Sequence, residues 1–96
     1  MCENIDENVG KILNTIDSLD LTENTIVVFL TDNGPNGKRY NGGMKGQKGS
    51  VDEGGVRVPL FIRYPAKFNR AMLINENAAH IDILPTIAEL CNISIP

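Results

Sequence analysis

The sequence predicts an α/β fold with the order helix, buried strand, long glycine-rich loop, strand, helix. Three observations lead to this prediction: an amphipathic helical pattern near the N-terminus, a non-alternating apolar run after it, and a second helical pattern near the C-terminus. The apolar run at residues 25–30 is rich in β-branched and aromatic residues and has polar segments on both sides, as in strands. With 96 residues the chain is long enough for one compact unit.

The first helix is predicted from apolar residues that recur at intervals of three and four. They are Val9, Ile12, Leu13, Ile16 and Leu19. This spacing places them on one face of a helix that ends near Leu19. Residues 20–24 are polar and are expected to connect the helix to the first strand.

Two strands are predicted on either side of the glycine-rich region. Residues 25–30 form an apolar run without alternation, which is typical of a central parallel strand covered on both faces. The second strand is placed at Leu60–Arg63, after Pro59, because proline removes a donor from the ladder. A central strand needs neighbours on both sides, and the chain offers one further strand. We therefore expect residues 1–96 to be a single, incomplete unit.

The last helix is predicted to follow Asp82. The apolar residues after it recur with helical spacing up to Cys91. Asp82 is expected to cap this helix, and Pro85 falls in the first turn, where its missing N–H costs little.

Composition and charge exclude several classes of partner. The formal net charge is -3 and the basic residues are scattered, so no nucleic-acid partner is expected. The longest apolar run, Ile26–Leu30, is far shorter than the roughly 20 residues of a membrane span. No signal peptide is recognised at the N-terminus, so an export signal would lie outside this chain. Cys2 and Cys91 lack metal-type spacing and are expected to be buried or free thiols.

Residues 34–55 are predicted to form a long loop. They contain eight of the nine glycines and four of the nine basic residues, with few apolar side chains. Loops longer than about 12–15 residues are uncommon in compact domains and are usually functional. This region is therefore the first candidate for a binding or catalytic role.

Asp32 and Asn33 are candidate metal ligands at the start of this region. They follow the predicted buried strand, and ligands bind at the carboxyl ends of strands in open α/β sheets. Their side chains are hard oxygen donors that suit calcium or magnesium, and Gly34 allows the backbone to turn away. The alternative is an ordinary turn, because Asp-Asn-Gly is also a favoured turn sequence.

Lys45 and Lys48 are candidate anion-binding residues, because ammonium groups and backbone N–H groups among glycines can surround an oxyanion. The alternative is a solvated basic loop. For Glu53 and Arg57, an ion pair that braces the end of the loop is preferred to a catalytic role. His80, the only histidine, is interpreted as structural rather than as an acid–base partner of Asp82, because residues two apart do not share a helix face.

Four segments together closely resemble the later catalytic-domain motifs of the sulfatase family, in the same order. They are residues 24–35, 43–50, 53–59 and 80–86. The resemblance covers nearly the whole chain from Val9 onward. It implies that residues 1–96 are a C-terminal part of a sulfatase catalytic domain, and thus a fragment of an alkaline-phosphatase-like α/β sandwich.

The resemblance also implies roles for individual residues. Asp32 and Asn33 are similar to two of the ligands of the active-site calcium (Ca²⁺). Lys48 is similar to the lysine that contacts the sulfate group, and Lys45 is a weaker candidate for substrate contact. The remaining motif residues are similar to structural members of their motifs; they are Glu53, Arg57, Asp82 and Pro85.

In this family the nucleophile is a formylglycine made from Cys or Ser in a Cys/Ser-x-Pro-x-Arg motif. That motif is absent from the chain, because Cys2 is followed by Glu-Asn-Ile and Cys91 by Asn-Ile-Ser. The paired aspartates that complete the calcium site, and the histidines and lysine that handle the leaving group, are also absent. The resemblance therefore implies an intact enzyme that acts on a sulfated carbohydrate or aryl sulfate, and a fragment that is inactive by itself.

Other functional classes stay open at this point. One is a phosphodiesterase or phosphatase of the same superfamily, although a single histidine argues against a two-metal site. Another is a non-catalytic module or truncated gene product. A chain with an open sheet edge is expected to self-associate in isolation. The compartment of the parent protein is left open, with a periplasmic or a secreted parent both compatible.

Overall fold

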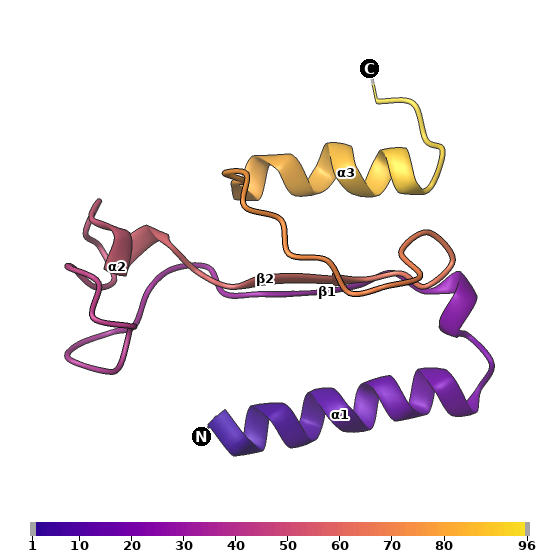
Figure 1. The fold of residues 1–96 in the computed structure, drawn as a ribbon, viewed down its shortest axis with the longest axis horizontal. Coiled ribbons are helices and arrows are strands. Elements are labelled where there is room, and N and C mark those ends of the chain that lie inside the picture. Colours follow the sequence, from indigo (N-terminus) through magenta and orange to yellow (C-terminus); the bar gives the residue numbers. More distant parts are fainter. Residues whose placement is uncertain (1, 96) are drawn as a thin grey trace.

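The computed structural model describes residues 2–95, which form helices on both sides of a small sheet (Figure 1). The elements in chain order are α1 (Cys2–Ser18), the 3-10 helix η1 (Thr22–Asn24), β1 (Val27–Leu30), α2 (Glu53–Val56), β2 (Leu60–Arg63), the 3-10 helix η2 (His80–Asp82) and α3 (Ile83–Leu90). The predicted mixture of helix and strand, and the predicted order of the main elements, are confirmed. The short helices η1, α2 and η2 were not predicted.

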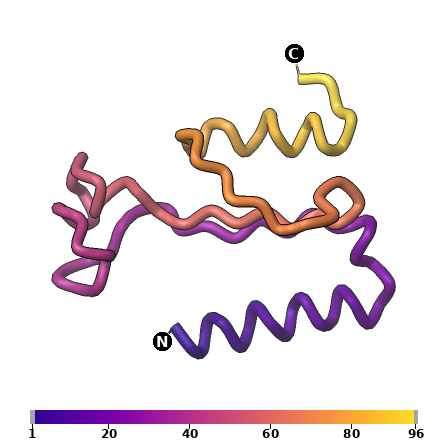
Figure 2. Tube along the Cα trace, viewed as in Figure 1, coloured from indigo at the N-terminus to yellow at the C-terminus, as the bar shows by residue number. Residues whose placement is uncertain are grey.

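The elements are arranged in three layers. Helix α1 lies along one face of the sheet and α3 along the other, while the loop that carries α2 extends beyond one end of the strands (Figure 1). The chain trace shows that β1 runs toward this end and that α3 begins near it (Figure 2). The layers therefore bring the start of α3 close to the point where the chain leaves β1.

The two strands are antiparallel, with Val27 opposite Arg63 and Leu30 opposite Leu60. The prediction that the first strand is parallel to its neighbour is therefore wrong for the pair within residues 2–95. Parallel pairing needs a crossover, usually through a helix of several turns, and the connection here contains only the four residues of α2. The non-alternating apolar pattern fits the other part of the prediction, because helices lie over both faces of the sheet (Figure 1).

Apolar side chains of the sheet are only partly covered, and those of β2 are the more exposed. Each residue of β1 is half-buried rather than buried as predicted. Phe29 and Phe61 face each other across the strands with ring centroids 6.2 Å apart, and Phe61 is 64% exposed. Among residues 2–95, Ala88 is the one buried hydrophobic residue. The sheet and helices thus form layers without enclosing a core.

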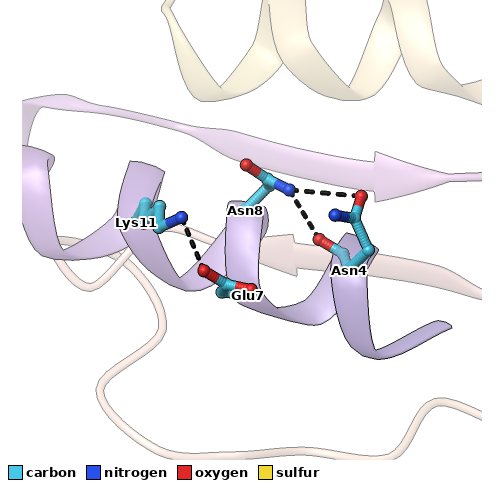
Figure 3. Close-up of polar contacts among 4 residues, drawn as sticks. All are labelled: Asn4, Glu7, Asn8 and Lys11. Atoms are coloured by element: carbon cyan, nitrogen blue, oxygen red, sulfur yellow. Dashed lines mark hydrogen bonds and ion pairs between the residues drawn. The ribbon is translucent and has the colours of Figure 1, made fainter. Parts of the chain in front are cut away.

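Helix α1 has the predicted apolar face in part. Val9, Leu13 and Ile16 are half-buried, whereas Ile12 and Leu19, which the pattern placed on the same face, are exposed. The start of α1 at Cys2 precedes the apolar pattern. Figure 3 shows one reason: Lys11 Nζ lies 2.6 Å from Glu7 Oε1, and the Asn8 amide donates to the Asn4 carbonyl oxygen at 2.6 Å. Side chains four residues apart lie on the same helix face, so these pairs stabilise the first turns.

One polar cluster attaches the end of α1 to β2. Arg63 donates a hydrogen bond of 2.7 Å to Asp17 Oδ1, and the Thr22 hydroxyl donates to the same oxygen. The hydrogen bonds from Thr22 and Arg63 hold the pKa of Asp17 below its ordinary value. Between α1 and the sheet an open cleft of roughly 710 Å³ remains, lined mainly by apolar residues. The helix is therefore fixed at its end and loosely packed along its length.

Asp82 does not cap α3 in the way that was predicted. It occupies the N-cap position, but its side chain makes no hydrogen bond to the first turn of α3. Its carboxylate instead accepts a 2.7 Å hydrogen bond from the backbone N–H of Ala79, which stabilises the start of η2. Pro85 lies in the first turn of α3, as predicted. Of the helices formed by residues 2–95, none is long and apolar enough to span a membrane.

Candidate functional site

The loop between the strands is held in shape by its backbone. The N–H of Gly34 donates to the carbonyl oxygen of Gly55 at 2.8 Å, and the N–H of Gly54 donates to that of Lys45 at 2.7 Å. The N–H of Lys48 donates to the carbonyl oxygen of Pro35 at 3.0 Å. These bonds bring the segment that follows β1 against the lysine-bearing segment, although the two are separated along the sequence.

Glycine is required where these segments meet. A Cβ at Gly34 would overlap the carbonyl oxygen of Gly54, and one at Gly55 would overlap that of Ser50. A Cβ at Gly54 would lie 2.6 Å from the carbonyl oxygen of Lys45. Gly54 and Gly55 are the buried residues of α2. Close approach of main chain to main chain, which only glycine permits, therefore sets the geometry of the loop.

Asp32 and Asn33 lie just beyond the end of β1, as predicted. The Asp32 side chain is exposed and that of Asn33 is half-buried. Carboxylate and amide oxygens suit calcium, which generally takes 6–8 oxygen ligands. Within the described residues, no group of three or more His, Cys, Asp or Glu side chains could hold a metal ion. The pair fits calcium in kind of ligand but provides only part of a coordination shell.

The two candidate lysines differ in their partners. Lys45 Nζ lies 3.2 Å from Asp52 Oδ1, so its ammonium is paired. Lys48 is exposed and makes no ion pair with any described residue. Its backbone is nevertheless fixed by the bond to Pro35. Of the two, Lys48 has the ammonium that is available to an anion.

Sequence reasoning missed three polar residues that shape this loop. The Asn41 amide donates to the carbonyl oxygens of Met44, at 2.8 Å, and Gly46, at 3.2 Å. The Ser50 hydroxyl donates to Asp52 Oδ2 at 2.7 Å and accepts from the Asp52 N–H at 3.0 Å. Asn before two glycines, and Ser two positions before Asp, are sequence signals for such side-chain-to-backbone bonds.

The structure settles two further interpretations of the motifs. Arg57 Nη1 lies 3.6 Å from Glu53 Oε2 across α2, so the predicted ion pair at the end of the loop is confirmed. His80 makes no hydrogen bond with Asp82; its Nε2 lies 3.2 Å from the carbonyl oxygen of Thr31. A structural contact for His80 is therefore present, at the exit of β1.

Comparison with known proteins identifies the family. Residues 1–93 match the family model described as Sulfatase. The chain is 36% identical to steryl-sulfatase of Mus musculus over 104 aligned residues, which cover 98% of this chain and 17% of that relative. It is 36% identical to N-acetylgalactosamine-6-O-sulfatase of Bacteroides thetaiotaomicron over 108 residues, covering 96% of the chain and 20% of the relative.

A third relative, human arylsulfatase A, is 37% identical over 97 residues, which cover 96% of this chain and 19% of the relative. The chain therefore spans about a fifth of the length of these curated relatives. No solved structure matches it.

Proposed function

Because the chain belongs to the sulfatase family, we propose that it supplies the calcium-binding and sulfate-binding part of a sulfatase catalytic site. The observation that carries this proposal is the hydrogen bond from the N–H of Lys48 to the carbonyl oxygen of Pro35. Pro35 lies three residues after Asp32, so this bond holds the candidate metal ligands and the candidate sulfate-binding lysine on one rigid loop. The metal-ligand pair alone, or the lysine alone, would be weak support for a catalytic site.

In this proposal the residues of the loop stabilise the negative charge of the sulfate group. Lys48 donates hydrogen bonds to a sulfate oxygen and stabilises negative charge that develops as the ester bond breaks. Asp32 and Asn33 donate oxygen ligands to a calcium ion, which would supply electrostatic stabilisation of the sulfate group when bound. Lys45 is held by Asp52 and braces the loop. Gly34 and Gly54 permit the close packing that keeps these groups together.

The nucleophile comes from outside these residues in this proposal. The Cys/Ser-x-Pro-x-Arg motif does not occur in residues 1–96, and neither Cys2 nor Cys91 has the required sequence after it. We therefore expect the 96-residue chain alone to hydrolyse no sulfate ester. We also propose that the layers of residues 2–95 form one part of an alkaline-phosphatase-like α/β sandwich, because the chain belongs to the sulfatase family.

The proposed substrate class is a sulfate ester of a carbohydrate or an aryl alcohol. The relatives are named for sulfatases of steryl, N-acetylgalactosamine and aryl compounds, which share the sulfate ester and differ in the alcohol. The residues that we assign would contact the sulfate group or the calcium ion beside it, so they support a sulfate ester as substrate. The alcohol would be selected by other parts of the enzyme.

A chimera tests the proposal. Residues 1–93 replace the matching segment of human arylsulfatase A, and kcat/KM is measured with 4-nitrophenyl sulfate. Lys48→Met should reduce kcat/KM by about 100-fold to 1,000-fold, the usual effect of removing one group that stabilises developing charge. Lys45→Met is the matched control and should cost less than about tenfold. Equal activity of the Lys48→Met and unsubstituted chimeras, with both folded, would refute the role of Lys48.

A further inference from the structure

Few side chains in the described part of the chain form long-range hydrogen bonds. Of those made by residues 2–95, two join residues more than five positions apart: Arg63 to Asp17, and His80 to Thr31. The first attaches α1 to the sheet. The second attaches the start of the α3 layer to the end of β1, where the candidate site begins.

The direction of the second bond follows from its chemistry. His80 Nε2 lies 3.2 Å from the carbonyl oxygen of Thr31, and a carbonyl oxygen only accepts hydrogen bonds. Nε2 therefore carries the proton and donates it, which both the neutral ring and the imidazolium can do. A nitrogen engaged in this way is not free to remove a proton from a substrate. His80 acts here as a hydrogen-bond donor, although its side chain is exposed.

The acceptor is the peptide group that precedes the candidate metal ligands. The Thr31 carbonyl belongs to the peptide plane that joins Thr31 to Asp32, so its orientation sets the direction in which Asp32 leaves the strand. On the other side, the N–H of Gly34 is held by the carbonyl oxygen of Gly55 at 2.8 Å. Asp32 and Asn33 thus lie between two anchored peptide groups, one of which depends on His80.

We propose that His80 is a positioning residue for the calcium site: its hydrogen bond to the Thr31 carbonyl orients Asp32 and Asn33 and couples α3 to the site. This inference rests on the proposed function. Groups that orient metal ligands commonly change metal affinity 10-fold to 100-fold when they are removed. The role requires one N–H donor at the place of Nε2 and requires no ionisation of the ring.

The test compares two amide side chains at position 80 of the 96-residue chain. Glutamine places an N–H near the position of the histidine Nε2, whereas asparagine is one bond shorter and falls short of the Thr31 carbonyl. Calcium is titrated into isotopically labelled chain, and the amide resonances of Asp32 and Asn33 are followed by NMR. Arg63→Leu is the matched control, because it breaks the other long-range hydrogen bond at the opposite end of β2.

We expect His80→Asn to weaken calcium affinity about tenfold or more and His80→Gln to stay within about twofold of the unsubstituted chain. Arg63→Leu should leave affinity unchanged. In calcium-free samples His80→Asn should move the resonances of residues 31–33, whereas His80→Gln should not. This second readout reports the positioning without any metal.

Two results would overturn the inference in different ways. Equal calcium affinity in the unsubstituted, His80→Asn and His80→Gln chains would refute the positioning role and leave the proposed function intact. If calcium left Asp32 and Asn33 unshifted in the unsubstituted chain at tens of millimolar, the metal assignment would fail, and the positioning role with it.

Discussion

The loop of residues 34–55 and the body of helices and strands are held together in opposite ways. The loop has little regular structure, yet Gly54 and Gly55 at its end are buried and its backbone is cross-linked by hydrogen bonds. The body has regular elements, yet Phe61 is 64% exposed and Ala88 is its one buried hydrophobic residue among those described. In this chain, therefore, the segment with the least regular secondary structure contains buried residues and many backbone contacts, whereas the helices and strands are poorly buried.

The comparison indicates where each region finds its stability. The loop is shaped by contacts among its own residues, from Gly34 to Gly55, and these do not need further chain. The apolar faces of the body are only partly covered. Burial of apolar surface stabilises the folded state in proportion to the area removed from water. We expect the body, and not the loop, to depend on partners that cover it.

The largest effect is expected from a methyl group at Gly54. Its Cβ would overlap the carbonyl oxygen of Gly46 and lie 2.6 Å from that of Lys45. Overpacking of this kind costs about 3 kcal/mol. Gly54→Ala should speed amide hydrogen exchange at Gly34 and Lys48 by about 100-fold, since exchange reports local opening.

Gly42→Ala provides the matched control in the same loop. Gly42 has φ of 72° but nothing within 4 Å of the added Cβ, so only backbone strain applies. The cost should be about 1 kcal/mol, with roughly fivefold faster exchange. If Gly54→Ala were no worse than Gly42→Ala, close main-chain packing would not be what shapes the loop.

Substitutions of exposed apolar residues in the body, and not in the loop, should weaken self-association of the chain. Phe61 is 64% exposed on β2, and Val51 is 93% exposed in the loop. Phe61→Ser should weaken association about tenfold in sedimentation equilibrium, because it removes a large apolar side chain from an uncovered sheet. Val51→Ser should have little effect. A monodisperse monomer before any substitution would favour an independent module over part of a larger domain.

Acidification should loosen the attachment of α1 to the sheet. Hydrogen bonds from Thr22 and Arg63 lower the pKa of Asp17 from its ordinary value of 3.8. The folded pKa lies below the unfolded value, so this contribution is fully present above about pH 3.8 and is lost as the pH falls through the lowered pKa. Asp17→Asn should remove this part of the acid dependence, as followed by amide exchange in α1 between pH 2 and 5. Unchanged acid dependence would contradict the assignment.

The smallest effect is expected in α1 itself. Gly10 lies within the helix, and a Cβ there would meet nothing within 4 Å. Gly10→Ala should therefore stabilise the helix by about 0.5–1 kcal/mol through backbone propensity alone. Circular dichroism at 222 nm during thermal unfolding measures the gain. A loss of stability would show that the helix packs more tightly than its open cleft suggests.

The parts of the structure that could be predicted are those that local sequence determines. The second strand is found at Leu60–Arg63 as predicted, because Pro59 marks its start. Three of the five residues predicted for the apolar face of α1, and the position of Pro85, also follow from local spacing. These features depend on residues within one or two helical turns or within one strand.

The parts that could not be predicted depend on contacts between distant segments. The antiparallel direction of β1 and β2 is decided by how the chain returns after residue 59. The pairing of Lys45 with Asp52 and the bond from His80 to Thr31 likewise join residues that no periodicity relates. The roles of Asp32, Asn33 and Lys48 stay predictions. They concern a calcium ion and a sulfate group, and contacts within the chain do not identify a bound ion or substrate.

The most direct test of the account is isothermal titration calorimetry of calcium into the 96-residue chain. Asp32 and Asn33 offer two side-chain ligands, whereas calcium generally takes 6–8 oxygens. If the chain carries one part of a composite site, as proposed, calcium should bind with a Kd no tighter than about 1 mM, and Asp32→Asn should weaken it further. A micromolar Kd would contradict the account, because it would show that these residues form a complete cation site by themselves.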